Sequence, residues 1–162
     1  MTTPGYTERL HVPLRWWALA TMFLATVLLA FLVATPGWVA FTTTGLLVGL
    51  TAALFLGYGG ARVEVADGET GPVFRAGRAH IPVDQLGVPV ALDAPASRRL
   101  AGVDADARAY LLLRPYVARS VQVPVQDPQD PAPYWLVSSR HPDRVVAALV
   151  AAGAPSGSAA QE

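Results

Sequence analysis

The side chains that could take part in catalysis are scattered over the second half of the sequence. Six polar candidates lie between positions 104 and 130, namely Asp104, Asp106, Arg114, Arg119, Asp127 and Asp130. Two carboxylates at short spacing, such as Asp104 and Asp106, could exchange protons or hold a metal ion. A solvated turn beside Gly102 is the simpler interpretation of that pair. An enzyme is therefore an alternative that depends on these residues converging in the fold.

Other signs of catalysis are weak. The three histidines, His11, His80 and His141, lie in separate segments and lack the spacing of metal ligands. The chain has no cysteine, which excludes disulfides, thiolate metal sites and a cysteine nucleophile. Ser138 and Ser139 precede His141, but no G-x-S-x-G sequence surrounds them. The sequence therefore predicts no catalytic residue, no cofactor and no metal ion.

The charge of the second half is balanced. All 12 basic residues are arginine, and ten of them lie between positions 62 and 152 together with ten acidic residues. Phosphate contacts supply most of the affinity for nucleic acid or anionic lipid, so a binder of either should carry a basic excess. The composition favours neither partner, and we expect no nucleic acid.

An aromatic pair and the loop before it predict a contact with another protein. The loop at residues 127–133 is rich in aspartate and proline, and Tyr134-Trp135 follow it directly. Aromatic side chains are enriched at protein interfaces. The predicted contact residues are Tyr134, Trp135, Asp127, Asp130 and Arg114. A core aromatic pair behind a stiff connector is the alternative interpretation.

The elements that would position these residues begin with an apolar hairpin. From Trp16 to Ala61 the sequence has no acidic, basic or histidine residue, and Pro36-Gly37 divides the stretch in two. Each half has about 20 apolar residues, the length of a helix that crosses a bilayer. We predict a transmembrane hairpin at residues 16–61, with spans at about 16–35 and 38–59. An irregular arm at residues 1–15 precedes it.

The charges around the hairpin predict its orientation. Arg9 and Arg15 precede the first span and Arg62 follows the second, whereas the Pro36-Gly37 turn is uncharged. Positive residues near span ends favour the cytoplasm, so we expect a multi-pass plasma-membrane protein with both termini inside. A cleaved signal peptide is the alternative for the first span. Because neither span contains a charge, we expect an anchor in the lipid bilayer and not a transporter.

Small residues recur every four positions in the second span, at Gly45, Gly49, Ala53 and Gly57. This spacing places them on one helix face, where they allow another backbone to approach closely. The favoured interpretation is that this glycine stripe packs the hairpin on itself. The alternative is that the stripe binds a second copy of the chain or another membrane protein.

Residues 62–152 are predicted to form a small β-rich domain. Short runs of alternating apolar and polar residues, such as 121–126, are interrupted by glycine and proline. Pro142 suits the first position of a helix, and Gly153 the position after its end. The expected fold is α+β, with mainly antiparallel strands in a barrel or sandwich closed by this C-terminal helix. We expect a disordered tail at residues 153–162.

Several motifs together resemble one known family. They are Arg9-Leu10, Trp16-Trp17, residues 109–115, residues 127–131 and residues 134–142. This combination is similar to DUF3093, a family of actinobacterial membrane proteins of unknown function with two N-terminal spans. The resemblance implies the anchor topology and brings no activity. The C-terminal part also resembles bacterial PH-like domains, which implies a PH-like barrel. The basic loop that binds phosphoinositides in many PH domains is not visible here.

The function predicted from these features is a membrane-anchored interaction or scaffold module without catalysis, at the cytosolic face. The expected partners are the bilayer and another membrane protein, or a second copy bound through the Gly45 and Gly49 face. The alternative is an enzyme, or an accessory subunit of one, that acts on an envelope or lipid-linked substrate at the inner leaflet.

Overall fold

The computed structural model describes residues 5–69 and 71–157 of the chain. These residues form two compact units, one from His11 to Gly60 and the other from the segments before and after it. Residues 1–4 of the predicted arm and 158–162 of the predicted tail lie outside the described residues.

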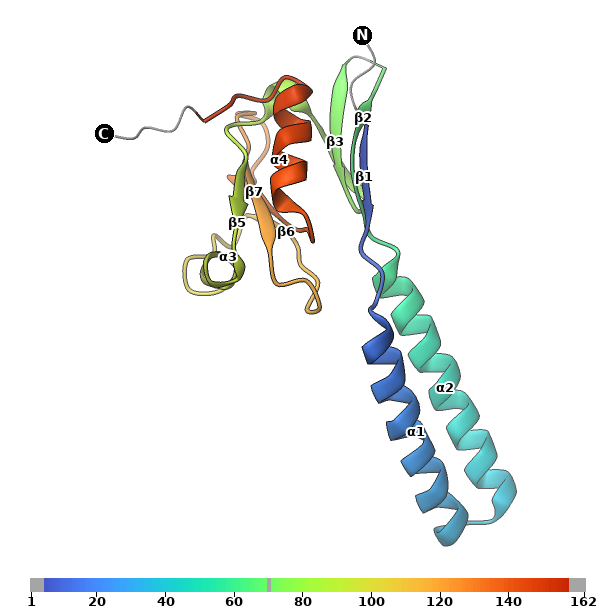
Figure 1. Ribbon diagram of the computed structural model, residues 1–162. Coiled ribbons are helices and arrows are strands. Elements are labelled where there is room, and N and C mark those ends of the chain that lie inside the picture. Colours follow the sequence, from blue (N-terminus) through green and yellow to red (C-terminus); the bar gives the residue numbers. More distant parts are fainter. Residues whose placement is uncertain (1–4, 70, 158–162) are drawn as a thin grey trace. The chain divides into compact units, whose positions relative to one another are not determined.

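The unit from His11 to Gly60 is a hairpin of two helices, α1 (Leu14–Ala34) and α2 (Gly37–Gly59) (Figure 1). Each helix starts directly after a proline, Pro13 or Pro36, whose fixed φ suits a helix start. Their mean hydropathies reach 2.3 and 1.9, so both are long and apolar enough to span a membrane. The Trp17 and Phe55 rings meet edge to face, with centroids 4.9 Å apart, and pack α1 against α2.

The glycine stripe does not hold this hairpin together. Gly45, Gly49, Ala53 and Gly57 are all exposed. A Cβ atom added to any of the three glycines would meet no neighbouring atom within 4 Å. Ala40 and Thr44, one turn apart on another face of α2, are the described residues of this helix that are buried. The interpretation that the stripe packs the hairpin on itself is therefore wrong, because helix spacing groups residues on a face without saying which face α1 covers.

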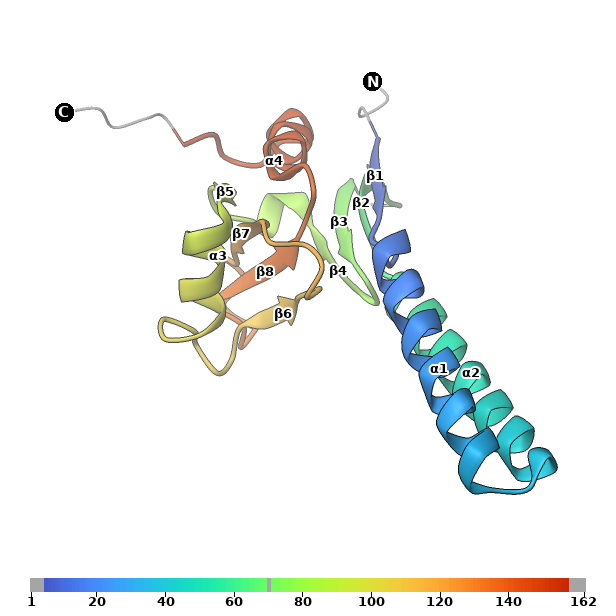
Figure 2. The same ribbon diagram turned by 60° about the horizontal axis from the view of Figure 1, so that its bottom comes forward.

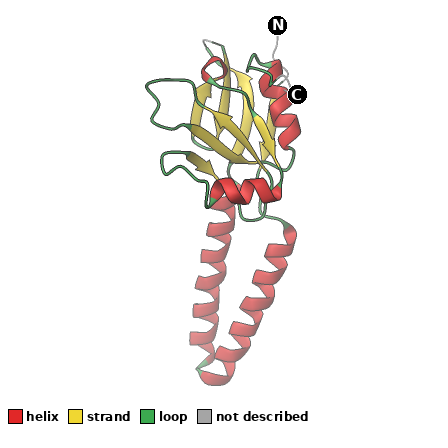
Figure 3. Cartoon of the chain, turned by 90° about the vertical axis from the view of Figure 1, so that its left-hand side faces the viewer, coloured by secondary structure: helices red, strands yellow, loops and turns green. Residues whose placement is uncertain are grey.

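The other unit is a β-rich domain with two sheets (Figure 3). The first sheet is an antiparallel meander in the order β1-β2-β3-β4, with strands β1 (Tyr6–Arg9), β2 (Arg62–Asp67), β3 (Pro72–Ala76) and β4 (Ala79–Pro82). The second has the order β5-β7-β8-β6, with strands β5 (Val90–Leu92), β6 (Tyr110–Leu112), β7 (Ser120–Pro124) and β8 (Tyr134–Ser138). A short 3-10 helix, η1 (Val83–Gln85), follows β4.

Strand β1 corrects the prediction for the N-terminal arm. Residues 6–9 are not irregular, because they pair with β2 along four positions, from Tyr6 opposite Val65 to Arg9 opposite Arg62. Leu10 then donates its backbone N–H to the carbonyl of Ala61 and is fully buried. The arm and the segment after the hairpin therefore belong to one sheet.

The second sheet contains one parallel pair, β6 with β8 (Figure 2). In the register of this pair, Tyr110 lies opposite Trp135. The prediction of mainly antiparallel strands is correct for every other pair of described strands. Residues 113–119 carry the chain from β6 past β8 to β7, so β6 and β7 do not pair. The placement of β6 beside β8 depends on this crossover connection. The alternation of apolar and polar residues in the sequence cannot reveal such a connection.

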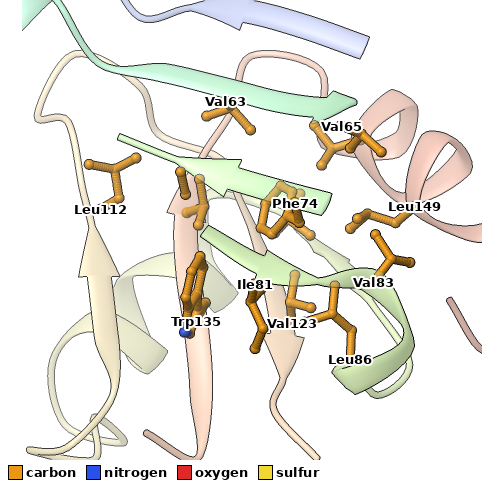
Figure 4. Close-up of a cluster of buried hydrophobic side chains, with 14 of the residues drawn as sticks. Val63, Val65, Phe74, Ile81, Val83, Leu86, Leu112, Val123, Trp135 and Leu149 are labelled. Atoms are coloured by element: carbon orange, nitrogen blue, oxygen red, sulfur yellow. The ribbon is translucent and has the colours of Figure 1, made fainter. Parts of the chain in front are cut away.

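Two helices complete the domain, α3 (Ala94–Ala101) and α4 (Pro142–Ala151). The C-terminal helix α4 contacts strands of both sheets, and its Val145 and Leu149 are fully buried. Figure 4 shows Leu149 among the side chains of the core. The predicted C-terminal helix is confirmed. Ala154 is also buried, with its N–H bonded to the carbonyl of Leu149, so the folded domain extends into the predicted tail.

Candidate functional site

The two loop aspartates fix the shape of their own loop. Asp127 accepts a hydrogen bond from the backbone N–H of Gln129 at 2.8 Å, and Asp130 accepts one from Ala132 at 2.8 Å. Such turns hold a backbone in one conformation, as aspartate side chains commonly do in loops. The described bonds of both carboxylates thus stabilise residues 127–133.

The other two acidic candidates each pair with a nearby arginine. Asp104 lies 3.4 Å from Arg99, and both side chains are half exposed or more. Asp106 lies 3.1 Å from Arg108, whose hydrogen bonds hold the pKa of Asp106 below its ordinary value. The same contact raises the pKa of Arg108. These are solvated local pairs, as in the simpler interpretation of the aspartates.

The described hydrogen bonds of the two arginine candidates each involve a backbone group. Arg114 donates its backbone N–H to the hydroxyl of Ser138 at 3.0 Å, and its Nη1 donates to the carbonyl of Leu113 at 3.1 Å. Arg119 is exposed, and its carbonyl accepts the N–H of Ser139. Both residues therefore help to position the strand β8 and its C-terminal end.

The aromatic pair lies in the core. Trp135 is 4% exposed, and its ring centroid lies 4.7 Å from that of Tyr110 and 6.0 Å from that of Phe74. Tyr134 is 9% exposed, and its hydroxyl accepts the backbone N–H of Asp106 at 3.1 Å. The alternative interpretation, a core pair behind a stiff connector, describes Tyr134 and Trp135 in this fold.

The six polar candidates do not come together in the grooves that we describe. One groove of about 220 Å³ lies between α3 and β7, and it is lined by Arg99, Asp104 and Gln122 among others. A second, of about 360 Å³, lies beside the C-terminal end of α4 and is lined by Asp84 and Gln85. Asp104 is the only one of the six that lines either groove. Among the described residues, no group of three or more acidic or histidine side chains could hold a metal ion.

The structure does assemble one polar cluster that the sequence did not predict. The carboxylate of Glu8, 9% exposed, points inward from the edge strand β1. Its Oε2 accepts hydrogen bonds from the hydroxyls of Tyr6 at 2.9 Å and Ser139 at 2.6 Å. Its Oε1 accepts the backbone N–H of Arg140 at 2.9 Å. We call these four residues the Glu8 cluster, and it joins β1 to the segment between β8 and α4.

Two further contacts reinforce this junction. The hydroxyl of Tyr116 donates to the carbonyl of Leu10, and the Nη1 of Arg140 donates to the carbonyl of Arg9 at 3.3 Å. The Ser139 hydroxyl also accepts the N–H of His141 at 3.1 Å and is fully buried. A buried hydroxyl committed to these bonds cannot reach a substrate in this conformation. The cluster is therefore suited to holding β1 in place and not to nucleophilic catalysis.

The sequence carries one signal for this cluster. Residues 5–10 alternate between side chains that point outward, such as Thr7 and Arg9, and side chains that point inward, namely Tyr6, Glu8 and Leu10. Period-two alternation is the pattern of a strand. A glutamate at an inward position would have indicated a buried acceptor in need of donors. Two of its three donors, Ser139 and Arg140, lie more than 130 positions away, so the sequence could not identify them.

A family model described as "Protein of unknown function (DUF3093)" matches residues 5–149 of the chain. No curated protein and no solved structure matches the chain. The match begins one residue before β1 and ends within α4, so it covers both sides of the Glu8 cluster.

Replacing Glu8 tests whether the cluster stabilises the domain. Glu8→Ala leaves the hydroxyl of Ser139 and the N–H of Arg140 without their acceptor, so we expect the free energy of unfolding to fall by about 3 kcal/mol. A double-mutant cycle with Ser139→Ala should give a coupling of about 1–2 kcal/mol. Denaturant titration of the full chain in detergent, followed by near-UV circular dichroism, measures both values. Glu64→Gln, on the outer face of the same sheet, is the control, and an equal loss in that variant would contradict the role of the cluster.

Titration of Tyr6 gives a second test of the same cluster. Burial, followed by the hydrogen bond to Glu8 and the charge of Glu8, raises the pKa of Tyr6 from 10.0 to about 12. A raised pKa in the folded state means that Tyr6 stabilises the fold fully below pH 10 and loses this contribution as the pH rises through 12. The melting temperature of the wild type should therefore fall more steeply across this interval than that of Tyr6→Phe. Parallel curves would show that Tyr6 is not coupled to folding.

Proposed function

Because the chain belongs to the DUF3093 family of unknown function, we propose its role from the geometry: a non-catalytic interaction module, anchored in the plasma membrane by α1 and α2. Both termini and the β-rich domain would lie in the cytoplasm. The arginines Arg9, Arg15 and Arg62 beside the ends of the helices support this orientation.

The observation that carries the anchor is the apolar surface all around the hairpin. Large side chains are exposed on both helices, including Phe23 at 68%, Leu19 at 64% and Leu46 at 71%. A helix that is apolar on every face needs an apolar environment, because each exposed Å² costs about 25 cal/mol in water. A bilayer supplies that environment without a further protein. The core helix of a soluble protein would instead be mostly buried.

The contact surface that we propose for a cytoplasmic partner is the loop at residues 127–133. Pro128, Gln129 and Pro131 are exposed there, while the bonds made by Asp127 and Asp130 hold the loop in one conformation. A loop that is already ordered loses little entropy when a partner binds. The buried pair Tyr134 and Trp135 would support this loop from the core and would not touch the partner.

For the domain itself we propose a PH-like barrel. An isolated bridge between Leu86 and Val125 links the chain after β4 to the segment after β7, and α4 contacts both sheets. Both features support a barrel plugged by its C-terminal helix. The enzymatic alternative needs its six polar candidates in one pocket, and the local pairs of Asp104 and Asp106 do not favour it.

The anchored-module proposal predicts two results for the full chain. The protein should stay in the membrane pellet after alkaline carbonate extraction, and a tagged copy should recover a stoichiometric partner from native membranes. Pro128→Ser, Gln129→Ser and Pro131→Ser together should abolish that recovery while leaving the pellet fraction unchanged. Serine substitutions at the exposed residues Val103, Ala105 and Ala107 are the control. Release by carbonate would refute the anchor, and recovery unaffected by the loop variant would refute the contact surface.

We further propose that α2 self-associates through the glycine stripe. Gly45 and Gly49 face open space in the hairpin, and glycines at this spacing let two helix backbones approach closely. Gly45→Leu with Gly49→Leu should convert a dimer into a monomer in mild detergent, measured by light scattering coupled to size exclusion. Leu46→Ala with Leu50→Ala, on a neighbouring face, is the control. A wild type that is already monomeric, or an unchanged mass in the glycine variant, would contradict self-association.

A further inference from the structure

The balanced composition hides a segregation of charge on the first sheet. The acidic side chains Asp67 and Glu69 lie at the end of β2 that leads into β3. Arg9 and Arg62 lie at the opposite end, directly across from each other in the β1–β2 ladder. Residues opposite each other in a ladder point to the same face, and both arginines are exposed. The sheet therefore has a basic end and an acidic end.

The arginine pair is unfavourable as it stands. Like charges directly opposite each other in a sheet are destabilising, whereas opposite charges stabilise. The next pair on the same face, Glu64 of β2 opposite Arg75 of β3, has opposite charges and is favourable. The salt bridges among the described residues are those of Arg99 and Arg108, so neither Arg9 nor Arg62 has a carboxylate partner there. An anion from outside the chain would remove the repulsion.

A third arginine lies near the pair. The N–H of Gly77 donates to the carbonyl of Arg62 at 2.8 Å, which places the turn between β3 and β4 beside this end of the ladder. Arg78 follows in that turn and is exposed. The positive charge at the basic end is thus larger than that of Arg9 and Arg62 alone.

Both arginines of the pair lie close to the apolar helices in the sequence. Arg62 follows Gly59, the last residue of α2, by three positions, and Arg9 precedes Leu14, the first of α1, by five. An extended chain spans at most about 3.6 Å per residue, so three residues reach about 11 Å at most. If α2 ends at the membrane surface, Arg62 lies within about 11 Å of the lipid headgroups, a distance comparable to the Debye length of about 10 Å at 0.1 M salt.

We propose that Arg9 and Arg62 together bind the phosphate of an anionic glycerophospholipid in the leaflet next to them. The guanidinium group presents a planar fork of donors that matches phosphate oxygens, so two of them can share one phosphate. A negative phosphate between the two guanidinium groups attracts both of them and offsets their mutual repulsion. This inference rests on the proposed membrane anchor, and it adds a lipid preference to it.

Lipid selectivity of the reconstituted full chain tests the site. Wild-type protein is placed in phosphatidylcholine vesicles with a trace of spin-labelled phosphatidylglycerol or phosphatidylcholine, and electron spin resonance gives their relative association with the protein. We expect the wild type to prefer phosphatidylglycerol. Arg9→Gln with Arg62→Gln should lower this preference by about fivefold for each arginine, which is the usual effect of one basic residue near an anionic surface. Arg9→Lys with Arg62→Lys keeps the charge but removes the planar fork, so its preference should lie between those of the wild type and the glutamine variant.

The matched control is Arg75→Gln with Arg98→Gln, which removes the same charge from exposed positions outside the pair. An equal loss in this control would overturn the site, as would a wild type without preference. Displacement of the labelled lipid by millimolar glycerol phosphate would show that a free phosphate is the occupant and would overturn the lipid. Failure of the proposed anchor is seen separately, because the wild type would then not float with the vesicles.

Discussion

The pairing of β1 with β2 is the constraint on which the rest of this structure depends. The two strands are separated in the sequence by the entire apolar hairpin, yet they form four consecutive pairs from Tyr6–Val65 to Arg9–Arg62. Paired strands hold their Cα atoms about 5 Å apart, whereas packed helix axes are 8–10 Å apart. The chain must therefore leave the sheet after β1 and re-enter it at β2 at neighbouring positions. The two connecting segments move apart over the few residues that lead into and out of the helices.

The same pairing makes the domain depend on residues before the hairpin. Leu10 is fully buried in the core, and Glu8 supplies the acceptor for Ser139 and Arg140. A buried carboxylate is tolerated when its oxygens receive hydrogen bonds, and here both do. An inward-pointing charge on an edge strand also discourages the edge from pairing with another chain. In β1 it has a defined set of donors in one register, so a slip by one residue would turn the carboxylate away from them.

The sequence predicts the elements whose signals are local and misses the relations that are not. The helix α4 could be predicted because Pro142 and Gly153 mark its ends and an apolar face lies between them. The alternation at strand β1 is too short to predict a strand by itself, since four residues form a strand only when a partner far along the chain covers them. The candidate residues Tyr134 and Trp135 illustrate the same limit. Their types suit either a core or an interface, and burial by Phe74 and Tyr110 decides between the two.

The sequence also does not show which neighbour a given face of a helix or strand is turned toward. The spacing of Gly45 and Gly49 correctly groups them on one side of α2, but only packing shows that this side is turned away from α1. Charge behaves in the same way: the composition between residues 62 and 152 is neutral, while register places Arg9 against Arg62 and Asp67 at the far end. In both cases the pairing of a segment with its neighbour leaves a surface without a partner among the described residues. The polar groups of the Glu8 cluster bind one another within the domain. The face of Gly45 and Gly49 and the pair Arg9 and Arg62 do not, so a ligand or partner can gain binding energy at these two surfaces.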